Sequence, residues 1–259
     1  MNIIRIALGC VLAANVAGRA AEPLNPLWQI GIADHRGAEF ALAPTNYSSF
    51  LERFGSPDRA YYIGLSKPDS DWPYLLPGPL DGWGGSSGNG RWDQMNTLPI
   101  GFTLEQAPAA GQCALIVDLC DARPGRPPRL RVTVNGQPFD RDLDAGSSED
   151  SLRGDWQAGK AQSVRVEFPA ALLRAGYNEI TLRSTKGSWM VFDDLRLEAP
   201  AEARLAPPAS TRTWERLMAR RWIRVALSLA IRFRTQTSPT GLVEPSRGLA
   251  ASAAPNTRI

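Results

Sequence analysis

Hydrophobic and polar residues alternate along much of the chain in short runs that are typical of half-buried β-strands. In the clearest runs, residues 129–134 and 163–168, every second residue is apolar. Asn135-Gly136 follows the first of these runs, and this dipeptide is the strongest short signal for a hairpin turn. The segments predicted to be strands are 27–32, 38–42, 60–64, 98–105, 113–121, 129–134, 163–168, 179–183 and 190–197.

The residues between these segments predict an all-β fold. Gly, Pro and Asn separate the strands, and only residues 170–173 suggest a helical turn, which stops at Gly176. A parallel α/β fold is excluded because no helix of crossover length separates two strands. Short strands with this alternation predict a β-sandwich of two antiparallel sheets. Long first and last strands with uneven connections favour a jelly roll.

The N-terminal residues differ from the strand-rich middle of the chain. Residues 1–20 contain Arg5, then the apolar run 6–14, then Gly18-Arg19-Ala20 as a small-x-small cleavage site. This pattern predicts a secretory signal peptide, so we expect the protein to be secreted or periplasmic. The apolar run is too short to cross a bilayer, so no transmembrane span is expected. One domain, residues 21–200, is predicted to follow.

Charge separates this predicted domain from a C-terminal tail, residues 201–259. The tail holds ten arginines and three glutamates, while the whole chain has a net charge of +3, which leaves −6 for residues 21–200 once Arg5 and Arg19 are set aside. An acidic domain argues against nucleic acid as a partner. Within the tail, residues 213–234 can be drawn as a cationic amphipathic helix between a linker and a disordered end. Two interpretations of this tail stay open: weak association with a membrane surface or polyanion, and an extension without a role.

Residues that ordinary catalytic sites require are scarce. Cys113 and Cys120 would lie about 23 Å apart on opposite faces of one strand, so both are expected to be free thiols. His35 is the single histidine. The usual zinc ligand sets are therefore missing, and no nucleophile elbow accompanies His35. The sequence predicts a domain without a catalytic apparatus of its own.

The segment 66–96 is the candidate ligand-binding region. It runs for about 30 residues without strand periodicity, and loops of that length are usually functional or disordered. Sugar rings have apolar faces and a rim of hydroxyls, so aromatic rings flanked by polar groups fit them. The candidate carbohydrate-binding residues are Trp72, Tyr74, Trp83, Trp92, Asp71, Asp81 and Arg91. The alternative is that the aromatic side chains anchor this loop to the sandwich.

Several sequence blocks, taken in order, resemble one protein family. They are Trp28-Gln29-Ile30-Gly31, Asp34 with Glu39-Phe40, Asp71-Trp72-Pro73-Tyr74, residues 130–138, residues 175–180 and residues 189–198. Together, over about residues 26–198, they resemble the third, jelly-roll domain of rhamnogalacturonan lyases, polysaccharide lyase family four. The resemblance implies a carbohydrate-binding-module-like fold and a pectic or related polysaccharide as the partner.

The resemblance does not carry over enzymatic activity. In the family, β-elimination is assigned to a lysine and a histidine of a separate N-terminal domain, and no residue here matches that pair. Three functions stay open: a secreted, non-catalytic binding module, part of an active polysaccharide lyase such as a rhamnogalacturonan endolyase, and a structural or interaction domain at the cell surface.

The resemblance also implies a structural calcium ion near the ends of the first and last strands. Glu39, Asp193 and Asp194 would supply the oxygen ligands that calcium prefers. The alternative is that one aspartate faces solvent and the other accepts hydrogen bonds from a neighbouring turn.

Overall fold

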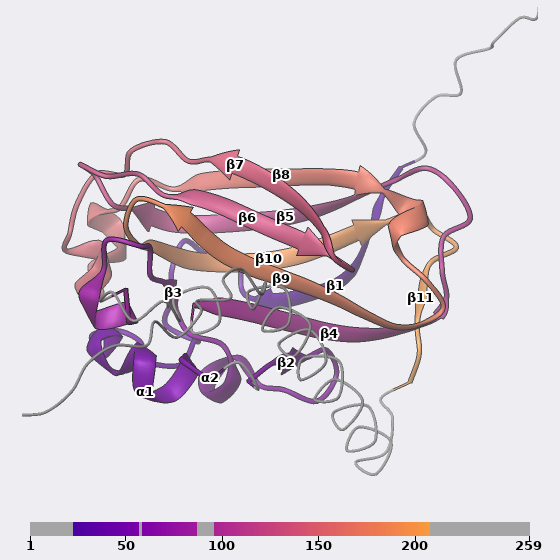
Figure 1. Ribbon diagram of the computed structural model, residues 1–259, viewed down its shortest axis with the longest axis horizontal. Coiled ribbons are helices and arrows are strands. Elements are labelled where there is room, and N and C mark those ends of the chain that lie inside the picture. Colours follow the sequence, from indigo (N-terminus) through magenta and orange to yellow (C-terminus); the bar gives the residue numbers. More distant parts are fainter. Residues whose placement is uncertain (1–22, 57–58, 87–95, 208–259) are drawn as a thin grey trace, which may run out of the picture. The chain divides into compact units, whose positions relative to one another are not determined.

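The computed structural model describes residues 23–56, 59–86 and 96–207 (Figure 1). The predicted signal peptide and the tail segment 213–234 lie outside these ranges. Among the described residues, no helix is both long enough and apolar enough to cross a membrane.

Strands dominate the described part of the chain, and their burial follows the alternation of the sequence. In β6 every second residue is buried, because successive side chains of a strand point to opposite faces. The strands are β1 (Asn25–Gly31), β2 (Tyr61–Tyr62), β3 (Leu75–Leu76), β4 (Thr97–Gln106), β5 (Gln112–Ala122), β6 (Arg129–Val134), β7 (Gln137–Asp142), β8 (Gln162–Pro169), β9 (Gly176–Lys186), β10 (Met190–Ala199) and β11 (Arg204–Leu205).

The strands form two sheets with the connectivity of a jelly roll. One sheet has the order β1-β10-β5-β8, with the short β3 beside β10, and the other has the order β11-β4-β9-β6-β7, with the short β2 beside β4. The pairs β6–β7, β5–β8, β4–β9 and β1–β10 are nested, and successive pairs fall in opposite sheets. A long antiparallel hairpin rolled on itself gives this order, so the predicted jelly-roll sandwich is confirmed. Among the strands of the described residues, β2 departs from the predicted antiparallel pairing, since it runs parallel to β4.

The core lies between the two sheets. Trp28 of β1 packs on Phe102 of β4 with ring centroids 5.7 Å apart, which joins the sheets at one edge. Cys113 and Cys120 are free thiols, as predicted, but both belong to the buried core. The alternation expected to place them on opposite faces is interrupted because the β5–β10 register shifts between Leu119 and Asp121.

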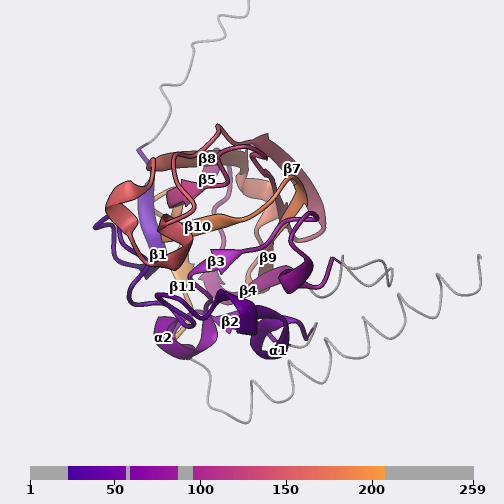
Figure 2. The same ribbon diagram turned by 90° about the vertical axis from the view of Figure 1, so that its left-hand side faces the viewer.

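The segment between β1 and β4 departs most from the predictions. Residues 38–42 do not form a strand: Leu42 has a left-handed φ of 70°, and the segment keeps only an isolated bridge from Ala41 to Pro73. The segment contains η1 (Tyr47–Ser49), α1 (Phe50–Phe54), α2 (Pro68–Asp71) and η2 (Gly82–Gly84). Both views place α1, α2 and β2 beside β4, on the opposite side of the sandwich from β7 and β8 (Figures 1 and 2).

Three short 3-10 helices complete the fold. They are η3 (Ser151–Arg153), η4 (Trp156–Ala158) and η5 (Ala170–Leu172), and η5 is the helical turn predicted from the sequence. A buried carboxylate orders the long β7–β8 connection, because Asp121 of β5 accepts hydrogen bonds from the backbone N–H groups of Ser147, Ser148 and Lys160 and from the Ser151 hydroxyl.

Candidate functional site

Two of the predicted sugar-stacking residues, Trp72 and Tyr74, are core side chains. Trp72 is 1% exposed and packs against Tyr61 and Phe192, with centroid distances of 5.9 and 5.6 Å. Tyr74 is fully buried, and its hydroxyl donates a hydrogen bond of 2.7 Å to the Leu152 carbonyl. Burial also raises the pKa of Tyr74. Neither ring offers a face at the surface, so the expected open platform is not formed by these two residues.

Trp83 remains as an aromatic candidate at the surface. Its half-buried indole, in η2, packs edge-on against Tyr47, whose ring centroid is 5.2 Å away at an interplanar angle of 71°. Phe50 of α1 supports the same indole from 6.5 Å. The sequence analysis missed Tyr47, because its proximity to Trp83 is created by the packing of η1 on η2. These two half-buried rings form what we call the Tyr47–Trp83 pair.

The polar candidates in this region have different surroundings. Asp81 is buried and accepts hydrogen bonds from Gly78 N, at 2.7 Å, and the Ser188 hydroxyl, at 2.5 Å. Burial raises the pKa of Asp81. These contacts tie the loop to the β9–β10 turn, so Asp81 holds the fold. Asp71 is partly exposed, and its Oδ2 accepts a hydrogen bond of 2.9 Å from Lys67 N. Arg91 and Trp92 lie outside the described residues.

Asp71 and Trp72 come together at a small depression beside β4. Its volume, including the open mouth, is about 210 Å³. The lining residues come from α1, β2, α2, β4 and the chain before β2: Phe54, Arg59, Ala60, Tyr61, Asp71, Trp72, Leu98 and Pro99. At its rim, Arg59 Nη2 lies 4.0 Å from Asp71 Oδ1. Desolvation by burial, together with the nearby charges of Asp71 and Asp69, raises the pKa of Tyr61 to about 12, so the phenol in the lining stays neutral.

The three residues predicted to hold calcium are divided between two places, with Glu39 and Asp193 near each other in one of them. Glu39 Oε1 accepts a hydrogen bond of 2.7 Å from Ile32 N, and Asp193 Oδ1 accepts bonds of 3.2 and 3.1 Å from the backbone N–H groups of Asp34 and Arg36. Burial raises the pKa of both carboxyls. Both carboxylates therefore stabilise the loop that follows β1. For Asp193 this agrees with the alternative given above, in which one aspartate accepts hydrogen bonds from a neighbouring turn.

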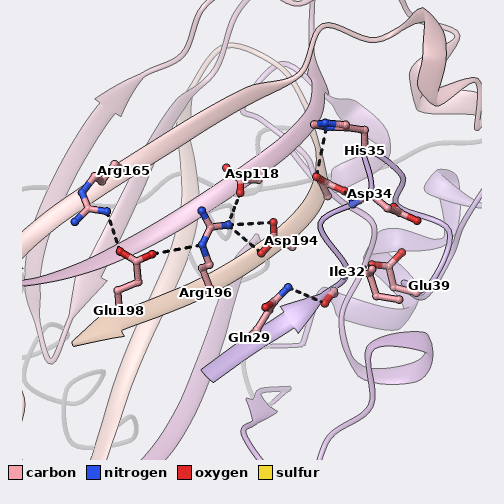
Figure 3. Close-up of polar contacts among 12 residues, drawn as sticks. Gln29, Ile32, Asp34, His35, Glu39, Asp118, Arg165, Asp194, Arg196 and Glu198 are labelled. Atoms are coloured by element: carbon pink, nitrogen blue, oxygen red, sulfur yellow. Dashed lines mark hydrogen bonds and ion pairs between the residues drawn. The ribbon is translucent and has the colours of Figure 1, made fainter. Parts of the chain in front are cut away.

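Asp194 lies on the other face of β10 from its neighbour, as successive strand residues do, and it pairs with Arg196 (Figure 3). The described residues include no group of three or more His, Cys, Asp or Glu side chains that could hold a metal ion. Asp194 is therefore separated from Glu39 and Asp193 by its contacts, and a calcium ion held by the latter two stays a prediction.

The outer face of the β1-β10-β5-β8 sheet carries a chain of ion pairs instead (Figure 3). Arg196 Nη1 lies 2.5 Å from Asp118 Oδ2 and 3.3 Å from Asp194 Oδ2, and Glu198 bridges Arg196 to Arg165, whose Nη1 lies 2.9 Å away. Desolvation by burial, then the hydrogen bond and charge of Asp118, raises the pKa of Asp194 to about 6. Each of these charged side chains therefore has an ion-pair partner within the protein.

Comparison with protein families decides where the chain belongs. Residues 26–197, which run from β1 into β10, match the CBM-like family described as polysaccharide lyase family 4, domain III. The chain belongs to this family. The match covers nearly all of β1 to β10 and confirms the resemblance seen in the short sequence blocks.

Solved structures similar to this CBM-like domain are remote. A family 35 carbohydrate-binding module from an environmental isolate is 20% identical, with 44% of this chain and 72% of that chain covered and a TM-score of 0.31. One from Cellvibrio japonicus is 16% identical, with 42% and 69% covered and a TM-score of 0.30. An exo-beta-1,3-galactanase from Phanerochaete chrysosporium is 18% identical, with 39% and 20% covered and a TM-score of 0.26. At such scores the likeness carries no argument about ligands. No curated protein matches the chain.

Within this CBM-like domain, two surface features adjoin along one side of the fold. Phe50 of α1 contacts Trp83, and Phe54, one turn further along the same helix, lies 5.9 Å from Phe50 and lines the depression. The Tyr47–Trp83 pair and the depression are thus joined through α1. The aromatic residues of the sequence indicate the segment 66–96 as a candidate region. They give no sign that Arg59, which precedes this segment in the chain, lines the depression.

Proposed function

We propose that this protein is a non-catalytic carbohydrate-binding module that binds pectic or related polysaccharide. Membership of the CBM-like domain family carries the proposal. The half-buried Tyr47–Trp83 pair supports it, because aromatic rings pack against the apolar faces of sugars while the hydroxyl groups at the rim of a sugar find polar partners. Binding rather than catalysis is proposed because of the surroundings of His35, the single histidine. It lies 3.7 Å from Asp193, and its contacts among the described residues include no nucleophile.

Affinity electrophoresis tests the proposal. The purified protein is run through gels containing rhamnogalacturonan, homogalacturonan or galactan, with a glycan-free gel as reference. Retardation by at least one of the three is expected. Migration unaffected by all three would overturn the proposal.

Trp83→Ala tests whether the Tyr47–Trp83 pair contributes. We expect it to weaken retardation by about tenfold, because one stacked ring contributes on the order of 1 kcal/mol beyond its buried area. Phe139→Ala is the matched control: Phe139 is also a half-buried ring packed on the core, but it lies on β7, across the sandwich from α1. Equal retardation of both variants would place the glycan elsewhere.

A second candidate function follows from the family description, which names one domain of a polysaccharide lyase. In this case the module would hold pectic polysaccharide for a lyase domain supplied by another chain. Incubating the protein alone with rhamnogalacturonan and following the ultraviolet absorbance of unsaturated products tests for activity of its own. We expect no product without an added lyase, and product formation by the pure protein would refute the non-catalytic assignment.

We further propose that residues 1–20 direct export and that the arginine-rich tail adds weak association with an anionic surface. N-terminal sequencing of the mature protein should begin at Ala21. Salt-sensitive sedimentation with anionic vesicles, lost on deletion of residues 208–259, should report the tail. A mature chain beginning at Met1, or sedimentation that survives the deletion, would refute the corresponding part.

A further inference from the structure

The outer face of strands β9, β6 and β7 carries a row of short side chains that crosses all three strands. These strands lie side by side in this order (Figure 1). Thr181 of β9 stands opposite Thr133 of β6, and Thr133 stands opposite Pro138 of β7. All three side chains lie at least partly open to solvent, whereas their neighbours along β6 and β9 are buried in the core. The row therefore brings two hydroxyl groups to the outer face.

Two arginines border this row on one side. Arg183 and Arg131 each lie two residues from a threonine of the row, and they stand opposite each other on β9 and β6. Arg131 in turn stands opposite Asp140 of β7 and donates two hydrogen bonds of 2.7 Å to its carboxylate. Like charges placed directly opposite each other destabilise a sheet, so the two arginines favour an anion bound above them.

The charges around these arginines make this side of the face basic. The cluster comprises Arg129, Arg131, Asp140, Asp142, Arg183 and Lys186. The hydrogen bond from Arg131, together with the charges of three arginines, lowers the pKa of Asp140, so this carboxylate stays ionised. Four cations thus accompany two carboxylates, within a domain whose residues 21–200 carry −6 overall. The cluster therefore concentrates positive charge that the domain lacks elsewhere.

The other side of the row carries an acceptor and two aromatic rings. Glu179 lies two residues before Thr181 on β9, and the Tyr177 hydroxyl donates a hydrogen bond of 3.1 Å to its Oε2. Glu179 stands opposite Gly101 of β4. A Cβ atom at Gly101 would lie 2.8 Å from Cε1 of Tyr62 and 2.9 Å from the Tyr177 hydroxyl, so both tyrosines pack closely over this glycine. A sugar on the row would meet guanidinium donors on one side and a carboxylate acceptor on the other.

This arrangement fits a sugar that carries a carboxylate. A guanidinium binds a carboxylate through paired N–H donors, which gives both strength and orientation. The hydroxyl groups of the same sugar ring can both donate and accept, so they suit the threonine hydroxyls and a protein carboxylate. A uronic acid combines the two kinds of group in one unit. A neutral sugar would leave the basic cluster without an anion.

We propose that the outer face of β9, β6 and β7 binds galacturonate units of a pectic chain. Their carboxylates pair with Arg131 and Arg183. Their ring hydroxyls bond to Thr133, Thr181 and Glu179. The inference rests on the proposed function and deepens it, because it assigns recognition of the acidic units to a surface made of other residues than the aromatic pair discussed above.

Calorimetric titration tests the assignment. The probes are tetragalacturonate, its fully methyl-esterified form, which has the same backbone without charge, and polyglutamate, which has carboxylates without sugar. We expect the ester and polyglutamate each to bind at least about tenfold more weakly than tetragalacturonate. Equal binding of the ester would overturn carboxylate recognition. Equal binding of polyglutamate, at the same carboxylate concentration, would reduce the site to unspecific charge attraction and overturn the proposal as well.

Three variants and a control localise the binding. Arg131→Gln and Arg183→Gln each remove one guanidinium, and we expect about tenfold weaker binding of tetragalacturonate for each. Thr181→Val keeps the β-branched shape and removes one hydroxyl, and we expect a loss of about threefold to tenfold. Arg165→Gln makes the same charge change at an exposed, ion-paired arginine on the outer face of the other sheet, and it should bind like the native protein.

The outcomes separate this inference from the proposed function. If both glutamine variants keep the native melting temperature and the native affinity, this face is not the site. If either of them does not fold, Thr181→Val decides, and unchanged affinity of that variant would overturn the inference. If polysaccharide gels retard the native protein but tetragalacturonate does not bind, the binding function stands and the inference is wrong. If no glycan binds, both proposals are wrong.

Discussion

Replacing Trp72 distinguishes a core indole from a ligand-facing one. Truncating a buried Trp to Ala costs about 3–5 kcal/mol through lost burial and the cavity left behind. Trp72 is 1% exposed and also loses two aromatic neighbours, Tyr61 and Phe192, each pair being worth about 0.5–1.5 kcal/mol beyond area. We therefore expect Trp72→Ala to lower the free energy of unfolding by an amount near the upper end, about 4–5 kcal/mol.

The matched substitution Trp72→Phe separates packing from polarity. It keeps an aromatic ring between Tyr61 and Phe192 and removes an indole N–H that has no partner, so its cost should stay below about 1.5 kcal/mol. Urea denaturation followed by far-ultraviolet circular dichroism measures both variants, because a backbone signal is independent of the number of tryptophans. A loss below about 1 kcal/mol for Trp72→Ala, with glycan binding abolished, would show that the indole faces the ligand and would refute the reasoning.

Three further predictions concern the scaffold. Asp121→Ala should destabilise the fold by about 3 kcal/mol or more and expose residues 143–160 to proteolysis, because four hydrogen-bond donors lose the same buried carboxylate. Unchanged urea midpoints and digestion patterns would contradict this. Gly136→Ala should lower the free energy of unfolding by about 1–2 kcal/mol, while Gly125→Ala should leave it nearly unchanged. Both positions have open space for a methyl group, but of the two only Gly136 has a positive φ, of 96°. Equal melting temperatures of the two variants would refute the role of the turn. The pKa of Asp194 is raised to about 6, so its contribution to stability is complete below about pH 4 and is lost as the pH rises through 6. The native protein should therefore gain stability relative to Asp194→Asn as the pH is lowered from 7 to 4. A constant difference in stability across that range would count against this prediction.

Much of the sandwich could be predicted from local sequence, because a strand with one buried face alternates in a way that few other structures do. The turn after β6 illustrates this: Asn135 and Gly136 both have positive φ, as a two-residue hairpin loop requires. The strand predicted at 38–42 does not form, although Phe40, Ala41 and Leu42 are all buried. These residues pair with another segment only through the isolated bridge at Ala41, so their hydrophobic character comes from a loop packed on the core.

The candidate site could be predicted only as a region. Aromatic residues in a long loop are needed both for anchoring it and for binding sugars, and composition does not distinguish Trp72, which is buried, from Trp83, which is half-buried. Asp194 could not join Glu39 and Asp193 for a simpler geometric reason, since Asp193 and Asp194 are neighbours on a strand and point to opposite faces. The position of Arg59 beside the depression could not be predicted, because it depends on contacts with α1 and α2.

The pairing of β1 with β10 sets how this domain can be joined to others. Asn25 stands directly opposite Ala199 in that ladder, so the two long strands that open and close the jelly roll meet at neighbouring points on one edge, and the chain then continues into β11. A unit whose first and last long strands meet in this way can be joined into a surface loop of a host protein without stretching it, provided that β11 is kept. A graft made on this edge should leave the Tyr47–Trp83 pair unaltered.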